Sequence, residues 1–340
     1  MKPTLWTRDE WSPLQECILG TAKEFNLTKD ISHYVVDWHD SSWSDYIEAD
    51  FEYITKDIIA EAEADLNYFQ TVLRTHGVVV HRPQTSLTCN QISNGMWETG
   101  QMQFYNVRDI AFVIDNTIVE SAMSVRTRYF EQYSIQHIFK QKFLEGAKWL
   151  SMPKPKLSDD HYSLNVFPDI PTHEPLLDGA NILRMGDDLL VSTNLTANKM
   201  GVEWLRRHFP NHRIHEIDLT HKVTSHIDTT FTVLKEGVVL INEERIKEDE
   251  VPDLFKDWTK VFITKDIIAD VQPKVKRGIA SKWVGMNMFS IDPNNVCVDA
   301  SQERLMEVIS QYVNPIPIPM KHSRILGGGL HCCTLDLLRN

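Results

Sequence analysis

The sequence predicts an α/β protein in which small units recur around an axis, as in a propeller. From about residue 100 a strand, a tight turn, a second strand, a helix and another short strand return several times. No Pro-, Gly- or Ser-rich linker divides the 340 residues, so we expect a single domain. Repeats of about 50–70 residues favour radial repetition over a doubly wound sheet, although loosely spaced ββα units also occur in open sheets.

The four clearest units each contain two short apolar strands joined by a turn rich in Asn, Asp, Gly or Pro, which is the turn chemistry of hairpins. The strand pairs are 110–114 with 118–121, 181–184 with 189–192, 231–234 with 238–241, and 283–290 with 296–299. An Arg-rich helical run follows the first pair, and "LTANKMGVEWLRRHF" and "QERLMEVISQYV" follow the second and the fourth.

A closed ring must also join its ends. The terminal strand 330–338 and the early strand 15–20 ("QECILG") are candidates to share one unit, which brings the total to five. The stretch around 26–76 is predicted to be a helix-rich insertion, because "DFEYITKDIIAEAEADLNYFQTVLRTHG" has apolar residues three and four apart. Gly77 is expected to end this helix before a strand at 78–81.

Composition narrows the class of function. The formal charge of −12 disfavours a nucleic-acid partner, which needs a basic face. No apolar run approaches the ~20 residues of a membrane span, and the first residues lack the apolar core of a signal peptide. We therefore expect a cytoplasmic protein that binds neither nucleic acid nor membrane. Five cysteines without CxxC spacing predict reduced thiols rather than a zinc ribbon or a disulfide framework.

Polar residues stand at or just before the first strand of several units. If the units are arranged about an axis, these residues would meet at one end of that axis. They are Asp109, Asp178, His226, Asp228 and Ser281, with Cys332 in the last strand. Taken singly, each carboxylate could equally be a turn or cap residue. Together they form a candidate active site.

Strand alternation bears on two neighbouring pairs. In an extended segment His226 and Asp228 would share a face while Ile227 points to the core. By the same rule Cys332 and Cys333 cannot both face the site, so one is a core sulfur and the other a candidate nucleophile. A vicinal disulfide, or a metal site of His331, Cys332 and His226, stays open, although no usual ligand spacing is present.

Taken together, ordered stretches from about residue 11 to the end resemble the amidinotransferases, the family of glycine amidinotransferase and the inosamine-phosphate and toxin-pathway enzymes. They are "EWSPLQECILG", "VRDIAFVIDNTIVESAMSVRTRYFE", "FLEGAKWLSMPKPKL", "EPLLDGANILRMGDDLLVS", "MGVEWLRRHF", "SHIDTTF", "SKWVGMNM" and "LGGGLHCCTLDLLR". The resemblance implies a pentein-type, five-bladed α/β propeller of ββαβ modules and a homodimer.

The resemblance also implies roles. The family nucleophile falls on Cys332, the general acid/base on His226, and the carboxylate that orients the imidazole on Asp178. The carboxylates that hold the guanidinium fall on Asp109 and Asp228. Two further substrate-binding residues are matched to Arg245, for the carboxylate of the donor, and Ser281.

The chain departs from the family pattern in four respects, and the last three concern the rim of the acceptor pocket. Asn181 replaces a second Asp, Val223 stands where the glycine enzyme has Asn, and Cys333 replaces an aromatic residue. The chain also ends seven residues after Cys333. We therefore leave the acceptor open among glycine, lysine, taurine, aminocyclitols and polyamine-like amines, and favour a small amine or amino acid.

The chemistry implied is transfer of the amidino group of L-arginine to a primary amine, with release of ornithine. Two carboxylates can fix the guanidinium plane over a thiol, and a His can protonate the leaving amine. The reaction would be ping-pong through an amidino-cysteine, without a metal or organic cofactor. A guanidino-group hydrolase, such as an arginine or agmatine deiminase or a dimethylargininase, is the alternative. A catalytically silent binding protein is a third.

Overall fold

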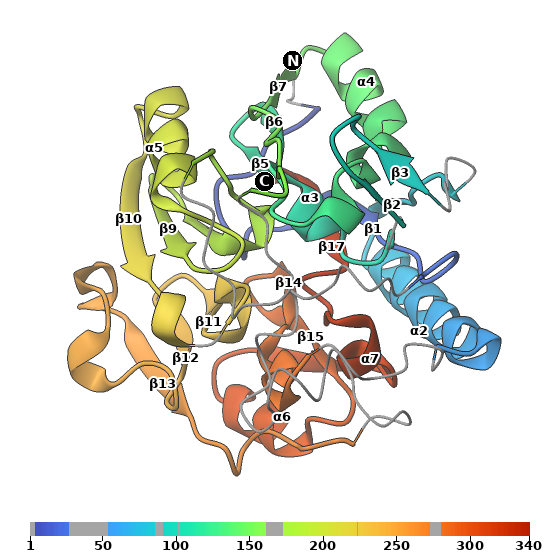
Figure 1. Cartoon of the computed structure of the whole chain (residues 1–340). Coiled ribbons are helices and arrows are strands. Elements are labelled where there is room, and N and C mark those ends of the chain that lie inside the picture. Colours follow the sequence, from blue (N-terminus) through green and yellow to red (C-terminus); the bar gives the residue numbers. More distant parts are fainter. Residues whose placement is uncertain are drawn as a thin grey trace.

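Five three-stranded sheets stand around a common centre in the described part of the chain, which comprises residues 4–26, 54–85, 91–100, 103–160, 173–222, 224–272 and 280–340 (Figure 1). In this computed structural model the first two strands of four sheets form an antiparallel hairpin, and the third strand runs parallel to the second. The parallel strand needs a crossover, and helices supply it in three of these sheets. The ββαβ modules of a five-bladed propeller in one domain are thereby confirmed.

The blades follow one another along the chain. They are β5 (Ala111–Ile114), β6 (Thr117–Glu120) and β7 (Lys148–Ser151); β8 (Ile182–Met185), β9 (Asp188–Thr193) and β10 (Arg213–Asp218); β11 (Phe231–Lys235), β12 (Val238–Asn242) and β13 (Thr259–Ile263); β14 (Phe289–Asp292), β15 (Asn295–Asp299) and β16 (Asn314–Ile318). The crossover helices are α4 (Gln136–Leu144), α5 (Lys199–His208) and α6 (Glu303–Ile309). A short hairpin, β3 (Ile92–Ser93) with β4 (Glu98–Thr99), lies outside these blades.

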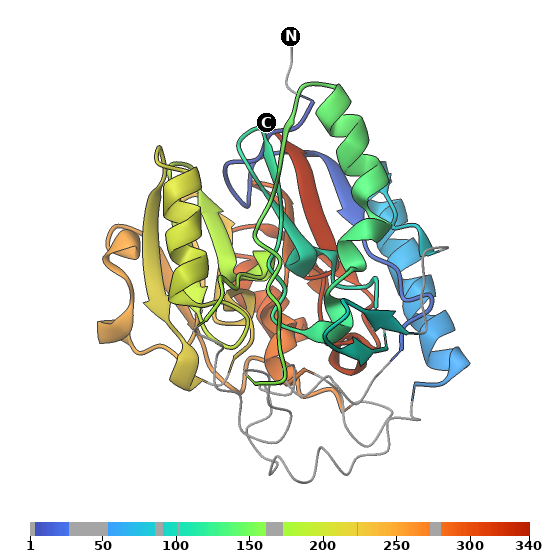
Figure 2. The same cartoon turned by 45° about the horizontal axis from the view of Figure 1, so that its top comes forward.

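The two ends of the chain share the fifth blade. β1 (Leu14–Leu19) lies between β17 (Thr334–Arg339), which is antiparallel to it, and β2 (Val79–His81), which is parallel. Figure 2 shows β1 and β17 side by side in blue and red. The predicted closure of the ring by the terminal strand is therefore confirmed.

Five apolar clusters of the core lie between neighbouring blades, and a sixth includes Ile92 of the β3–β4 hairpin. Successive residues of a strand point to opposite faces, so β5 places Ala111 and Val113 in the cluster shared with β1 and β17. Phe112 and Ile114 of the same strand enter the cluster shared with β8 and β9. Because both faces are covered, the strand is apolar throughout and shows no alternation with polar residues.

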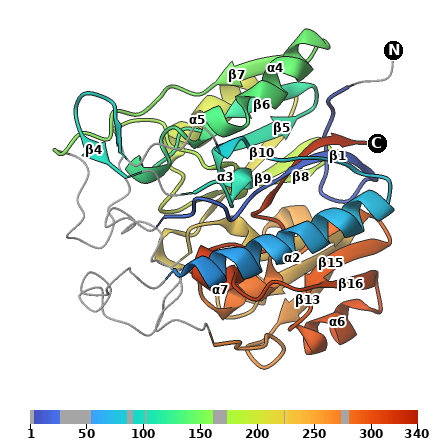
Figure 3. The same cartoon turned by 90° about the vertical axis from the view of Figure 1, so that its right-hand side faces the viewer.

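α2 (Lys56–Thr75) lies along the outside of the molecule between the closing blade and the blade of β14–β16 (Figure 3). The hydroxyl of Thr55 accepts a hydrogen bond from the Ile58 amide at 3.3 Å and caps its first turn. Phe69 packs edge-on against Phe289 with ring centroids 6.1 Å apart. Beyond the helix, Gly77 has a φ of +83°, the left-handed conformation that commonly ends helices.

Three sequence expectations differ from the structure near the site. Residues Lys282–Met286 form a 3₁₀-helix and the strand begins only at Phe289, since its partner β15 has no residues to pair with the earlier segment. Asp228 lies in a 3₁₀-helix, Ile227–Thr229, rather than in a strand. Cys332 lies in a turn before β17, not in the strand itself.

Residues 27–53 of the predicted insertion, Cys89 and Val223 lie outside the described residues. α2 occurs between β1 and β2 in the chain, which is the place of the crossover helix in the other blades. Within the described ranges, none of the helices has the length and apolar character needed to cross a membrane.

Candidate active site

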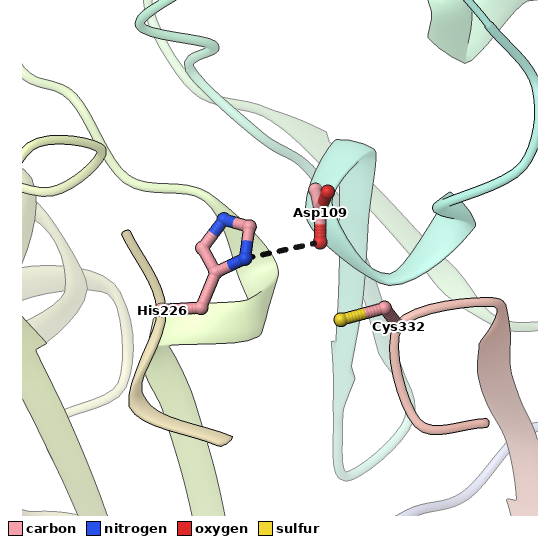
Figure 4. A group of neighbouring side chains, drawn as sticks. All are labelled: Asp109, His226 and Cys332. Atoms are coloured by element: carbon pink, nitrogen blue, oxygen red, sulfur yellow. Dashed lines mark ion pairs between the residues drawn. The ribbon is translucent and has the colours of Figure 1, made fainter. Parts of the chain in front are cut away.

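The candidate residues lie on short helical turns that lead into the first strands of different blades. Asp109 lies on α3 (Val107–Ile110), Asp178 directly precedes the 3₁₀-helix Gly179–Asn181, and His226 precedes the 3₁₀-helix that contains Asp228. Cys332 lies in the turn before β17. Figure 4 shows Asp109, His226 and Cys332 pointing toward one another from three separate segments.

These side chains meet in a buried cluster. One carboxylate oxygen of Asp109, one ring nitrogen of His226 and the sulfur of Cys332 lie within 4.8 Å of one another. The Nε2 of His226 is 3.3 Å from an oxygen of Asp178, and its Nδ1 is 3.9 Å from Asp109. Asp109, His226 and Cys332 have the geometry to hold a metal ion, whereas His331 of the metal set considered from the sequence turns to Asp228 and Glu10.

Carboxylates control the charge of His226. Burial lowers its pKa, but Asp109, Asp178 and Asp228 oppose this and raise it to about 9. Burial also raises the pKa of Asp178, to about 6, although its hydrogen bond to His226 works in the other direction. His226 therefore carries a proton at neutral pH and can act as a general acid.

The Cys332 thiol lies between a carboxylate and an amide. Its sulfur is 3.4 Å from an oxygen of Asp228 and accepts a hydrogen bond from Nδ2 of Asn287 at 3.1 Å. Burial, followed by Asp228 and Asp109, raises the pKa of Cys332 well above its usual range. A cation in the site would offset the two carboxylates and favour the thiolate, which is the nucleophilic form.

Asp228 is held as a carboxylate by His331. The Nδ1 of His331 is 2.8 Å from Asp228, and its Nε2 is 3.4 Å from Glu10, which forms a bidentate pair with Arg184 at 2.8 Å. Burial alone would raise the pKa of Asp228, but the hydrogen bond and charge of His331 bring it below its usual value. His331 thus connects the site to the buried ion pair between Glu10 and Arg184.

Three carboxylates of this cluster each have one unpartnered oxygen. One oxygen of Asp109 accepts from Arg128, one of Asp178 from His226, and one of Asp228 from His331. The other oxygen of each is buried and accepts no hydrogen bond from any described residue. Such oxygens fit a ligand with several N–H donors and a positive charge, because a buried unpaired acceptor is costly.

The two further predicted binding residues lie beside this cluster. Arg245 is buried and donates hydrogen bonds to the hydroxyls of Thr224, Thr229 and Thr230 at 2.7–3.2 Å. The hydroxyl of Ser281 accepts from the Trp283 amide at 3.3 Å and caps a 3₁₀-helix. Both contacts are structural, and substrate binding by Arg245 and Ser281 stays a prediction.

Each glycine of the triplet before the cysteines has a separate reason. Gly327 ends α7 (Ser323–Leu326) with a φ of +77°. A Cβ on Gly328 would lie 2.0 Å from the Asn106 side chain, and one on Gly329 would lie 2.8 Å from that of Asn287. The two cysteines do face different surroundings, but they lie in a turn, so strand alternation is not the reason: Cys332 enters the site and Cys333 joins an apolar core cluster with Cys17.

Sequence reasoning missed Asn287 and assigned no function to the contacts of His331. Both residues occur in quoted stretches, "SKWVGMNM" and "LGGGLHCC", so their proximity to the site in sequence was visible. Neither residue type signals a contact with a thiol or a carboxylate from another blade. Only the packing of the blade of β14–β16 against the turn before β17 brings Asn287 to the sulfur.

A dimethylarginine dimethylaminohydrolase structure shares the fold, with a TM-score of 0.61 at 14% identity, over 95% of this chain and 100% of that one. No protein-family model matches the chain.

Amidinotransferases are much more similar. The chain is 33% identical to inosamine-phosphate amidinotransferase 1 of Streptomyces glaucescens, over 97% of this chain and 95% of that protein. It is 31% identical to the mitochondrial glycine amidinotransferase of Gallus gallus, over 97% and 82%. The structure of an inosamine-phosphate amidinotransferase of Streptomyces griseus matches with a TM-score of 0.91 and 30% identity, over 100% of this chain and 98% of that one. The chain therefore belongs to the amidinotransferase family of enzymes.

Proposed function

We propose that the protein transfers the amidino group of L-arginine to a primary amine and releases ornithine, through a covalent intermediate on Cys332. The observation that carries the proposal is a buried cluster of three carboxylates, each with one unpartnered oxygen. Asp109 and Asp228 lie beside the Cys332 thiol, and Asp178 lies beside His226. A planar guanidinium presents several N–H donors and one positive charge, which complements these oxygens and compensates their charge. Asp109 and Asp228 are the proposed guanidinium ligands, since both lie close enough to Cys332 to raise its pKa.

The first half-reaction begins when the guanidinium binds and its charge favours loss of the thiol proton to solvent. The Cys332 thiolate then attacks the central carbon, so a C–S bond forms and one C–N π pair moves to nitrogen. His226, protonated at neutral pH, donates its proton to the nitrogen of the leaving amine. The C–N bond breaks, ornithine departs, and a cationic amidino group remains on the sulfur. Asp178 stabilises the imidazolium before this transfer.

The second half-reaction reverses these steps with another amine. His226, now neutral, takes a proton from the incoming amine, whose nitrogen attacks the amidino carbon. The C–S bond breaks and the thiolate leaves as the product guanidine forms. The relatives named above act on different acceptors, inosamine phosphate and glycine. We therefore propose no particular acceptor amine for this protein and leave its identification to the experiment.

The test is incubation of the purified protein with L-arginine and a panel of amines, with ornithine and the new guanidino compound measured by mass spectrometry. The expected result is at most one equivalent of ornithine per enzyme without an acceptor, and continued ornithine release only together with an acceptor product. Citrulline formed from arginine in the absence of any acceptor would contradict the transferase and favour the hydrolase. Arginine without acceptor should also add one amidino group to the intact protein, and Cys332→Ser should abolish this adduct.

Two broader expectations accompany the proposal. A homodimer is implied by the family resemblance, and light scattering of the purified protein would measure it. A cytoplasmic location is expected from the sequence alone, and fractionation of the source cells would test it.

A further inference from the structure

Asn287 occupies a fixed position between two blades. It ends the 3₁₀-helix Lys282–Met286 and is only 3% exposed. Its backbone N–H donates to Val284 at 3.0 Å, and the hydroxyl of Thr232 donates to the carbonyl of Met286, one residue earlier, at 2.8 Å. The side chain therefore projects from a rigid support.

Its carboxamide makes two hydrogen bonds to Cys332. The Oδ1 of Asn287 accepts from the backbone N–H of Cys332 at 2.8 Å, and Nδ2 donates to the sulfur at 3.1 Å. The first contact determines the orientation of the amide, because a backbone N–H can only donate and must face the oxygen. The N–H₂ group is then necessarily the one that faces the sulfur.

The backbone of Asn287 holds the same turn. Its carbonyl accepts from the N–H groups of Leu330 at 3.0 Å and His331 at 3.4 Å. Gly329 packs against its side chain so closely that a Cβ there would lie 2.8 Å from the Cβ of Asn287. The turn of the nucleophile is thus built around this one asparagine.

We propose that Asn287 is a further catalytic residue, whose Nδ2–H hydrogen bond positions the Cys332 sulfur and stabilises it as the thiolate. The role follows from the proposed function, in which the thiolate is both the attacking group and the group expelled in the second half-reaction. Hydrogen bonds to a charged acceptor are stronger than those to a neutral one, so the contact stabilises the thiolate more than the thiol.

The hydrogen bond from Asn287 opposes the effect of the carboxylates around the sulfur. Asp228 and Asp109 both oppose the thiolate, and His226 faces it across the cluster. The nearby hydroxyl of Tyr105 is engaged with the carbonyl of Gly328 at 3.3 Å. Among the described residues, Asn287 makes the hydrogen bond that is donated to the sulfur.

The experiment is a pH titration of the Cys332 thiolate by its ultraviolet absorbance, without substrate, in the wild type, Asn287→Ala and Asn287→Asp. The trace of Cys332→Ser is subtracted from each. We expect Asn287→Ala to raise the midpoint, so that the thiolate fraction below it falls about tenfold, since a hydrogen bond to a charged group is lost. Asn287→Asp keeps the acceptor for the Cys332 N–H but adds a negative charge, and should raise the midpoint further.

A matched control separates chemistry from support of the turn. Asn106 is also buried, donates to the carbonyl of Leu326 at 3.3 Å and packs against Gly328, but makes no hydrogen bond to the sulfur. Asn106→Ala should lower the melting temperature without moving the thiolate midpoint. An equal shift in Asn106→Ala, or an unchanged midpoint in both folded Asn287 variants, would overturn the proposal.

The thiolate titration tests the role of Asn287, and the transferase assay tests the proposed function, so a negative result in one can be told from a negative result in the other. If the wild type releases no ornithine, the proposed function is contradicted, while the titration still decides whether Asn287 stabilises the thiolate. If ornithine forms and Asn287→Ala turns over at the wild-type rate with an unshifted midpoint, the function stands and the inference about Asn287 is wrong.

Discussion

Asp178 and Asp228 are both fully buried aspartates of the same site, yet their surroundings move their pKa values in opposite directions. Asp178 faces His226, and burial raises its pKa to about 6 in spite of that contact. Asp228 faces His331 at 2.8 Å, and its pKa falls below the usual value in spite of burial. The difference is the second partner: His331 is backed by Glu10 and Arg184, whereas His226 is shared between several carboxylates.

This contrast separates two functions that need the same residue type. A carboxylate that holds a guanidinium must stay charged, and a network that favours the charged form provides this at Asp228. A carboxylate that supports a proton-transferring imidazole can have a pKa nearer to that of its partner, as Asp178 does. Asp228 with His331 thus forms the anionic binding half of the site. Asp178 with His226 forms its proton-transfer half.

The comparison depends first on which thiol lies between the two halves. Cys332→Ser should reduce turnover at least ~10³-fold, because a hydroxyl is a far weaker nucleophile than a thiolate. Cys333 packs in the core and its thiol donates to the carbonyl of Leu330 at 3.4 Å, so Cys333→Ser should retain turnover. Steady-state ornithine release measures both, and inactive Cys333→Ser protein with wild-type folding would refute the assignment.

Exchanging the charge in each half should give different kinetic signatures. Asp228→Asn is expected to raise KM for the guanidino donor, since it removes a charge that holds the substrate, while Asp178→Asn should mainly lower kcat. We expect a loss in kcat/KM of about 10²-fold or more for each, the typical scale of a positioned charge or acid–base partner. Equal effects on KM and kcat in the two variants would remove the distinction between the halves.

The pH dependence of kcat/KM should reflect the ionisation of His226 and Asp178 in the proton-transfer half. With a pKa of about 9, His226 is protonated at neutral pH, so kcat/KM should fall above about pH 9 as the general acid is lost. Below about pH 6 Asp178 takes up a proton and its support of the imidazolium is lost. In Asp178→Asn the alkaline limb should move to lower pH, because one carboxylate that raises the pKa of His226 is gone. An unmoved limb would assign that pKa to another group.

Replacing His331, the partner of Asp228 in the binding half, should lower the free energy of unfolding. His331→Asn leaves Asp228 and Glu10 with weaker contacts, and we expect a loss of about 1–3 kcal/mol in the free energy of unfolding at pH 7. A carboxyl with a lowered folded-state pKa stabilises above its unfolded value near ~4 and loses this as pH falls, so the loss should shrink in acid. Urea unfolding at several pH values measures it.

The matched control for that variant is His322→Asn. The buried His322 ring meets a partly exposed carboxylate, Glu61, at 2.8 Å, and should lose less because solvent can replace the contact. A larger loss in this control than in His331→Asn would mean that burial of the ring, rather than the charge network, sets the cost.

Much of the fold could be predicted from local signals. The turn residues at 115–116, 186–187 and 235–237 determine hairpins, and apolar runs such as Ala111–Ile114 mark strands covered on both faces. The pairing of the first and last strands followed from the requirement that a ring of blades must close. These features depend on interactions within about ten residues or on one topological condition, so the order of residues is enough to specify them.

The site was only partly accessible in this way. The polar residues before each first strand marked its members, but one-turn helices, not strands, carry Asp109 and Asp228 to the centre. Neither the hydrogen bond from Asn287 to Cys332 nor the opposite pKa shifts of Asp178 and Asp228 follow from residue order. Burial, dielectric surroundings and contacts between residues 45–104 positions apart produce them, and only the packing of separate blades decides those.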